Sequence, residues 1–219
     1  MKSINKRHLL ITLLPSILIL VIVAIVSIYF NVKIPLITRD VAAIGKINPL
    51  YGILSSLGVL LWCVTASVCF FSAMILKNIG QANNFWFLLN SAFLSSYLML
   101  DDLFLFHESL ASMYFGINEK VVFVILGLVV FAYLTKYRLK ILKTNYSVLL
   151  LALGFLSLSV VIDTVLEQWL WRTGSWKFFI EDGFKWLGIV SWCSYYMHTS
   201  LLLIINKPKK LLNDKYGVD

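Results

Sequence analysis

Acidic residues inside apolar segments are the feature of this sequence that bears most directly on chemistry. Seven of its eleven acidic residues lie within such a segment or at one end of it. A charged side chain at the centre of a membrane helix costs roughly 2.5–3.5 kcal/mol, and the residues retained there usually mark ion, proton or substrate sites. The place where these side chains meet is therefore the expected functional site. The seven are Asp101, Asp102, Glu108, Asp163, Glu167, Glu181 and Asp182.

Such a cluster must balance its charge. Several neighbouring carboxylates cannot all stay ionised, because like charges raise one another's pKa, and Lys185 offsets only part of the charge. Protons, water or a bound cation must balance the remainder. Oxygen-rich sites with one imidazole suit a divalent ion such as Zn, Fe, Mn, Mg or Ca. We therefore expect a divalent metal ion, with these candidate ligands: Asp101, His107, Glu108, Asp163, Glu167 and Glu181.

No established catalytic motif accompanies these residues. The spacing from Asp101 to Glu108 matches neither the ExxH pairs of di-iron bundles nor the HExxH of zinc proteases. The chain also lacks a GxSxG nucleophile turn. The expected chemistry therefore depends on segments that converge in space.

Composition places the chain among polytopic membrane proteins. Apolar residues make up 60% of the 219 residues and charged residues only 14%, with a mean hydropathy of +0.85. The net charge of +8 does not indicate a nucleic-acid partner, because the basic residues flank apolar runs instead of forming a basic face. The three cysteines lie in apolar stretches without a CxxC pair and are expected to be buried thiols.

Six apolar runs of about 20 residues predict an all-α bundle of six transmembrane helices. The first run follows Lys2, Lys6 and Arg7, as in a signal peptide, but its length and the lack of a small-x-small cleavage site favour a retained helix. No internal repeat or long linker divides the chain, so we expect one transmembrane domain over residues 1–219. The predicted spans are 9–30, 51–76, 85–106, 120–135, 147–167 and 181–206.

The distribution of basic residues predicts that both termini are cytoplasmic, in a bacterial plasma membrane. With this orientation, twelve Lys and Arg residues lie inside and six lie outside. The inner residues are Lys2, Lys6, Arg7, Lys77, Lys136, Arg138, Lys140, Lys143, Lys207, Lys209, Lys210 and Lys215. The outer residues are Lys33, Arg39, Lys46, Lys120, Arg172 and Lys177.

This topology brings the acidic residues of three segments to the outer membrane level. At about 100° per residue, Asp101 and Glu108 share a helix face, because they are seven residues apart. Asp163 and Glu167 are four residues apart and share a face of the fifth predicted helix. Glu181 and Lys185 are also four residues apart and share a face of the sixth.

In an ideal helix, Asp102 and His107 would lie on opposite sides of the helix face that carries Asp101. Both can reach the same centre only if the helix end unwinds. We place His107 in the site and leave Asp102 open.

Two segments carry a resemblance to known proteins. LMLDDLFLFHE (98–108) and EDGFKWLGIVSWCSYY (181–196) resemble motifs of uncharacterised bacterial multi-pass proteins, a likeness that implies no activity. The Leu-Asp-acid string also resembles that of alkaline-ceramidase-type membrane hydrolases, which bind zinc. Those proteins use several late histidines and seven spans, whereas only His107 lies near this site.

Two functions and one structural alternative follow. The first is a metal-dependent hydrolase that acts on a membrane lipid or lipid-linked substrate, with Glu108, Asp163 and Lys185 as catalytic residues. The second is a proton or cation channel or transporter that uses the same carboxylates. In the third, a structural membrane subunit, the acids are ordinary helix-end residues and Glu181 pairs with Lys185.

Overall fold

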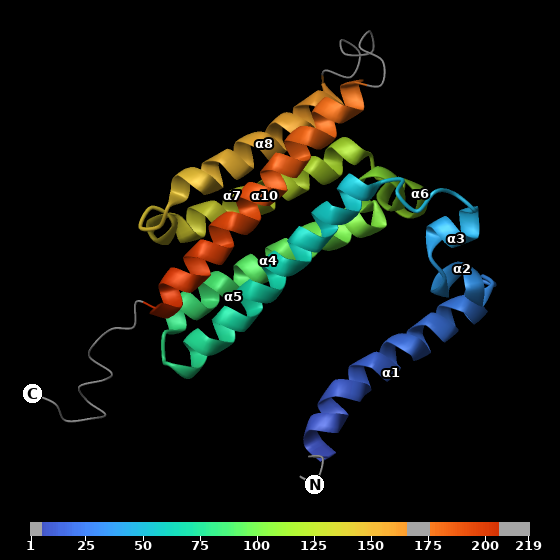
Figure 1. Cartoon of the computed structure of the whole chain (residues 1–219), viewed down its shortest axis with the longest axis horizontal. Helices are drawn as coiled ribbons and strands as arrows, with labels where there is room; N and C mark the ends of the chain where they lie inside the picture. Colours follow the sequence, from blue (N-terminus) through green and yellow to red (C-terminus); the bar gives the residue numbers. More distant parts are fainter. Residues whose placement is uncertain (1–5, 166–175, 206–219) are drawn as a thin grey trace, which may run out of the picture. The chain divides into compact units, whose positions relative to one another are not determined.

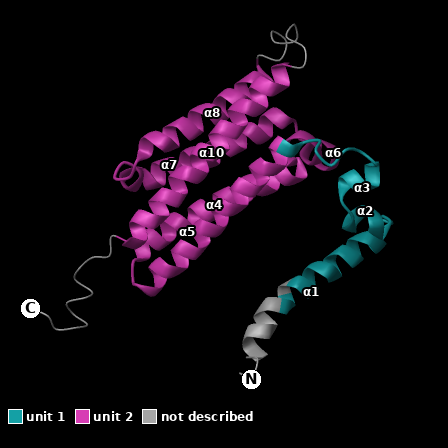
Figure 2. Cartoon of the chain, in the orientation of Figure 1, with its two compact units in different colours: residues 1–53 teal, residues 54–219 magenta. Residues whose placement is uncertain are grey.

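The computed structural model describes residues 6–165 and 176–205, and every regular element in these two ranges is helical. The predicted all-helical class is therefore confirmed for the described residues. The chain divides into two compact units, residues 1–53 and 54–219, which we describe separately (Figure 2). The expectation of one domain over 1–219 stays a prediction.

The first unit contains one long helix and two short ones. Helix α1 (Lys6–Tyr29) covers most of the predicted first span, and α2 (Ile34–Thr38) and α3 (Val41–Gly45) follow it. Asn31 and Lys46 adopt left-handed backbone conformations, with φ of 52° and 50°. Each of these residues lies just after a helix and ends it.

The second unit is a bundle of five long helices (Figure 1). Four of them are long and apolar enough to cross a membrane, and α5 becomes a fifth candidate when it is joined to the short helices after it. Four to five candidate spans thus lie in the described part of the chain, while the count of six and the orientation stay predictions. The five helices are α4 (Ile53–Asn78), α5 (Ala82–Phe104), α7 (Glu119–Ile141), α8 (Tyr146–Thr164) and α10 (Trp176–Ile205).

A sharp break follows α5. Leu105 takes a left-handed conformation with φ of 50°, which is unfavourable for a leucine. The chain then forms a short π-helix, η1 (Phe106–Leu110), and helix α6 (Ala111–Phe115), which are bent by 62° from α5. Because π-turns widen the helix locally, residues after the break do not continue the faces of α5.

Large aromatic side chains fill the centre of the bundle. Trp62 of α4, Phe87 of α5, and Trp192 and Tyr196 of α10 are each at most 2% exposed. Hydrogen bonds link these helices inside the core: Trp192 donates to Ser95 Oγ at 3.1 Å, and the hydroxyl groups of Tyr133 and Tyr196 lie 2.8 Å apart. The bundle interior is therefore both packed and hydrogen-bonded.

Helices α8 and α10 approach each other closely at Gly188. A Cβ atom at this position would lie 2.7 Å from Leu156 Cγ and 3.0 Å from the Leu156 backbone nitrogen. A methyl group at residue 188 would thus force the two helices apart. Gly183 lies on the same helix with nothing within 4 Å of such a Cβ, which makes it a matched control.

We expect Gly188→Ala to lower the free energy of unfolding by about 1–3 kcal/mol, because it overpacks the contact with Leu156. Gly183→Ala should raise it by about 0.5–1 kcal/mol, because alanine favours a helix. Thermal unfolding of the detergent-solubilised protein measures both changes. Equal stability of the two variants would show that α8 and α10 do not meet at Gly188.

Candidate functional site

A buried carboxylate–imidazole pair lies just past the end of α5. Asp101 Oδ2 is 2.7 Å from His107 Nδ1, and the His107 backbone N–H donates to Asp101 Oδ1 at 3.1 Å. The residues are only 5% and 7% exposed. The imidazole ring packs on Phe123 of α7, with ring centroids 4.8 Å apart. These contacts fix the ring so that Nε2 faces Glu108 Oε1 at 3.5 Å.

The break at Leu105 makes this pairing geometrically accessible. Residues six apart in a regular helix point about 120° away from each other, so Asp101 and His107 would not meet. The left-handed Leu105 and the π-turn after it redirect the chain and bring His107 back to Asp101. The end of α5 thus unwinds, which is the condition that the sequence set for Asp102 and His107 to reach the same centre.

His107 lies past this bend, in the short helices that form a fifth candidate span when they are joined to α5. A carboxylate oxygen faces each of its ring nitrogens, from Asp101 at Nδ1 and from Glu108 at Nε2. A ring that carries a proton on both nitrogens can donate to both carboxylates.

Asp102 binds two other helices. Its Oδ1 is 2.8 Å from Lys185 Nζ of α10, and its Oδ2 accepts a hydrogen bond of 2.8 Å from Trp62 Nε1 of α4. The Trp62 ring meets Trp192 edge to face, with centroids 5.7 Å apart. Asp102, which the sequence left open, thus joins three helices above a layer of tryptophan. Among the described ion pairs, the acid that binds Lys185 is Asp102 and not the expected Glu181.

A second set of carboxylates comes from α7, α8 and α10. Glu119 lies within hydrogen-bonding reach of Asp163, and the charge of Asp163 also acts on Glu181. Charge interactions of Glu119 with His107 and Glu108 connect this set to the first one. The structure therefore brings acidic residues from four long helices and η1 to one region.

Glu119 was not among the seven residues selected from the sequence. It follows Asn118, which caps α7 by accepting a hydrogen bond from the Lys120 backbone N–H at 2.9 Å. Such an acid looks like an ordinary first-turn residue, which the positive end of the helix dipole stabilises. The predicted span began at residue 120, and a start one residue earlier would have included it.

The described residues do not fit the expected metal ion. Among them, no group of three His, Cys, Asp or Glu side chains is arranged to hold a metal, and carboxylates already face both nitrogens of His107. Glu167 lies outside the described residues. The ligand and catalytic roles of Asp101, Glu108, Asp163, Glu181 and Lys185 stay predictions.

A groove of about 300 Å³ lies between α7 and α8 beside the second carboxylate set. Lys120 and Thr164, two of its lining residues, directly follow Glu119 and Asp163 in the chain. The remaining lining residues are apolar, so the groove suits a hydrocarbon chain with a polar group at Lys120. They are Phe123, Val124, Val160 and Val165.

The fold and this cluster define a helical membrane protein with an ionisable site near one end of its bundle. Residues 14–199 match a protein family described as a domain of unknown function (DUF8692), and the chain belongs to this family. No curated protein and no solved structure matches the chain significantly. The membership agrees with the expected uncharacterised family, while bacterial origin and the likeness to ceramidase-type hydrolases stay predictions.

We expect Lys185→Met to lower the free energy of unfolding by about 1–3 kcal/mol, because it leaves the partly buried Asp102 carboxylate without its cation. Asp102→Asn combined with Lys185→Met should recover most of this loss, and Lys185→Arg should retain the pair. Thermal unfolding measures all three variants. A Lys185→Met protein as stable as the parent would rule out the ion pair.

The pairing of Asp101 with His107 also predicts an effect on stability. His107→Gln removes the ring that partners the buried Asp101 carboxylate, so we expect it to lower the free energy of unfolding by about 3 kcal/mol. Thermal unfolding measures the change against the parent. A His107→Gln protein as stable as the parent would contradict the pairing.

Proposed function

We propose that this protein is a membrane-embedded hydrolase that acts by acid–base catalysis on a lipid or lipid-linked substrate. The observation that carries the proposal is the oriented imidazole: Asp101 holds His107 by Nδ1, and Nε2 faces Glu108. A fixed, protonated imidazole beside carboxylates has the parts of a general acid and a general base.

The carboxylate pair supplies the base in this proposal. An ionised carboxylate of this pair, Glu119 with Asp163, can accept a proton from water. The hydroxide then attacks an acyl or phosphoryl centre and forms a bond to it. The bond to the leaving oxygen breaks, and His107 gives that oxygen its proton. The proton taken up by the pair returns to His107 through the cluster, so the charges balance.

The surroundings favour a lipid substrate. The α7–α8 groove lies beside Glu119 and Asp163 and is lined mainly by apolar side chains, so it can hold a hydrocarbon chain while the head group reaches the carboxylates. Lys120 in the same groove offers a positive charge to an anionic head group. Below the cluster, Trp62 and Trp192 close the bundle.

A second candidate, proton or cation transport, is favoured by the closeness of Glu119 to Asp163, since carboxylates gathered in a membrane protein often mark a proton or ion site. It requires a water-accessible path along α10 from Glu181 towards Thr199. Trp192 and Tyr196 lie on that path, and both are fully buried against neighbouring side chains. The packing of α10 therefore favours hydrolysis over conduction.

The test compares lipid turnover by the parent protein and three variants. Purified protein is incubated with an extract of membrane lipids, and mass spectrometry follows released fatty acids and head groups. Because general acid–base catalysis contributes typically 10²–10⁴-fold, His107→Asn and Asp163→Asn should slow release by about that factor. Asp40→Asn is the matched control, since Asp40 is an exposed acid of the first unit.

Two further measurements separate the candidates. Elemental analysis of the parent and of Asp163→Asn tests the expected divalent ion directly. A pH-sensitive dye in protein-containing vesicles tests proton flux. Flux that Asp163→Asn abolishes, with no lipid turnover by the parent, would contradict the hydrolase and support transport.

A further inference from the structure

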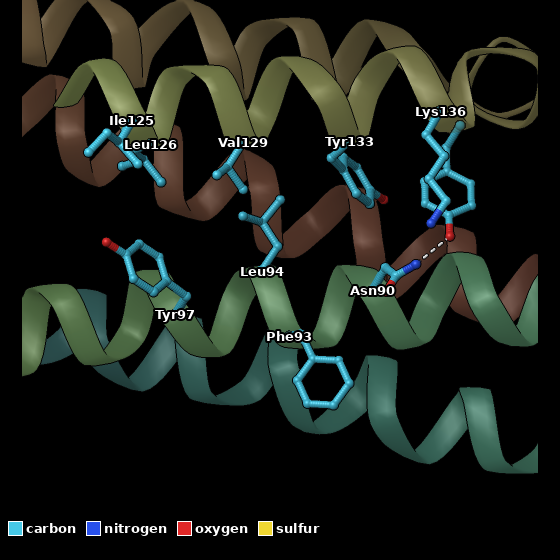
Figure 3. A pocket seen from close by; sticks show the side chains of 10 residues that line it. Asn90, Phe93, Leu94, Tyr97, Ile125, Leu126, Val129, Tyr133 and Lys136 are labelled. Atoms are coloured by element: carbon cyan, nitrogen blue, oxygen red, sulfur yellow. Dashed lines mark hydrogen bonds between the residues drawn. The ribbon is translucent and has the colours of Figure 1, made fainter. Parts of the chain in front are cut away.

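A second groove, of about 470 Å³, lies between α5 and α7 (Figure 3). No residue of the cluster lines it. Lys136, at its polar end, lies seventeen residues beyond Glu119 on α7, which corresponds to about 25 Å along the helix. A ligand bound by Lys136 at this end would not contact the carboxylate cluster. What this groove binds therefore does not depend on the proposed hydrolase.

The lining of this groove changes from apolar to polar along its length. Leu94 of α5 and Val129 of α7 face each other in its apolar middle (Figure 3). At one end the amide of Asn90 donates to the hydroxyl of Tyr137, which in turn donates to the Trp86 carbonyl at 3.1 Å. Lys136 and Tyr133 lie at this same end. The other lining residues are Phe93, Tyr97, Ile125 and Leu126.

Lys136 brings an unbalanced positive charge to the polar end. Its Nζ lies 5.3 Å from the centroid of the Tyr137 ring, and within residues 6–165 and 176–205 it pairs with no carboxylate. Lys140, one turn further along α7, is already engaged by the Asn83 carbonyl and by Asn84 Oδ1. Lys136 is therefore the cation of this groove that can meet an anion.

The charge and the apolar lining together specify the ligand. Basic pockets between membrane helices bind anionic lipid head groups, and the hydrocarbon part of such a lipid suits an apolar groove. We propose that this groove binds one acyl chain of an anionic phospholipid, with the phosphate of its head group at Lys136. Asn90 then flanks the head group, and the chain extends past Val129 towards Tyr97.

The test measures binding of two probe lipids to the delipidated full-length protein in detergent. Native mass spectrometry compares phosphatidylglycerol with phosphatidylcholine of identical acyl chains. A basic residue near an anionic head group strengthens binding by about fivefold, so the parent should prefer phosphatidylglycerol by about that factor. Lys136→Gln should remove the preference, and Lys136→Arg should retain it.

Two more variants test whether the lipid occupies the groove itself. Lys143→Gln removes a positive charge from the loop just after α7 and should leave the preference unchanged, since Lys143 does not line the groove. Val129→Trp fills the apolar middle and should weaken binding of both lipids at least about fivefold, because the acyl chain loses its place. Equal binding of the two lipids by the parent, or equal losses in Lys136→Gln and Lys143→Gln, would overturn the proposal. Unchanged binding in Val129→Trp would place the acyl chain elsewhere and also overturn it.

Discussion

A carboxylate that is shielded from water needs a partner. The adjacent residues Asp101 and Asp102 find their partners in different parts of the chain. Asp101 binds the chain that follows it, through the ring and backbone of His107. Asp102 binds two other helices, through Lys185 and Trp62. An unpaired carboxylate in this environment destabilises the fold by several kcal/mol. Losing either partner is therefore unfavourable, which keeps the partners in position. These two side chains thus connect the end of α5 to the chain after the break, to α10 and to α4.

The tryptophan layer below Asp102 separates two regions of the bundle. Trp62 donates its ring N–H to Asp102, and its ring packs edge to face with that of Trp192. The ring N–H of Trp192 in turn donates to Ser95. Polar groups deeper in the bundle bind one another in the same way, as the hydroxyl groups of Tyr133 and Tyr196 do. Ionisable groups therefore gather at one end of the core, and neutral hydrogen bonds fill the rest. The proposed hydrolase would work at the end that holds the ionisable groups.

Most of the helical organisation was predictable from the sequence, because apolar runs of membrane length have few other solutions. The predicted span 120–135 was too short: α7 continues to Ile141, because Tyr133 and Tyr137 turn inward and give its polar end a buried face. The site was harder to predict. The pairing of Asp101 with His107 depends on a left-handed leucine, which no sequence pattern indicates. Likewise, Glu181 and Asp182 lie about one helical turn before Lys185 and were possible partners for it. Only the packing of α5 against α10 brings Asp102 to Lys185 instead.

The central claim is that carboxylates hold His107 as a fixed, charged imidazole at the end of the bundle. Nitrogen-15 NMR of the histidine side chains tests it most directly, and the chain has only three histidines to assign. At neutral pH the account predicts that both ring nitrogens of His107 carry protons, and that Asp101→Asn removes this signature. A neutral, freely titrating ring in the parent protein would contradict the account.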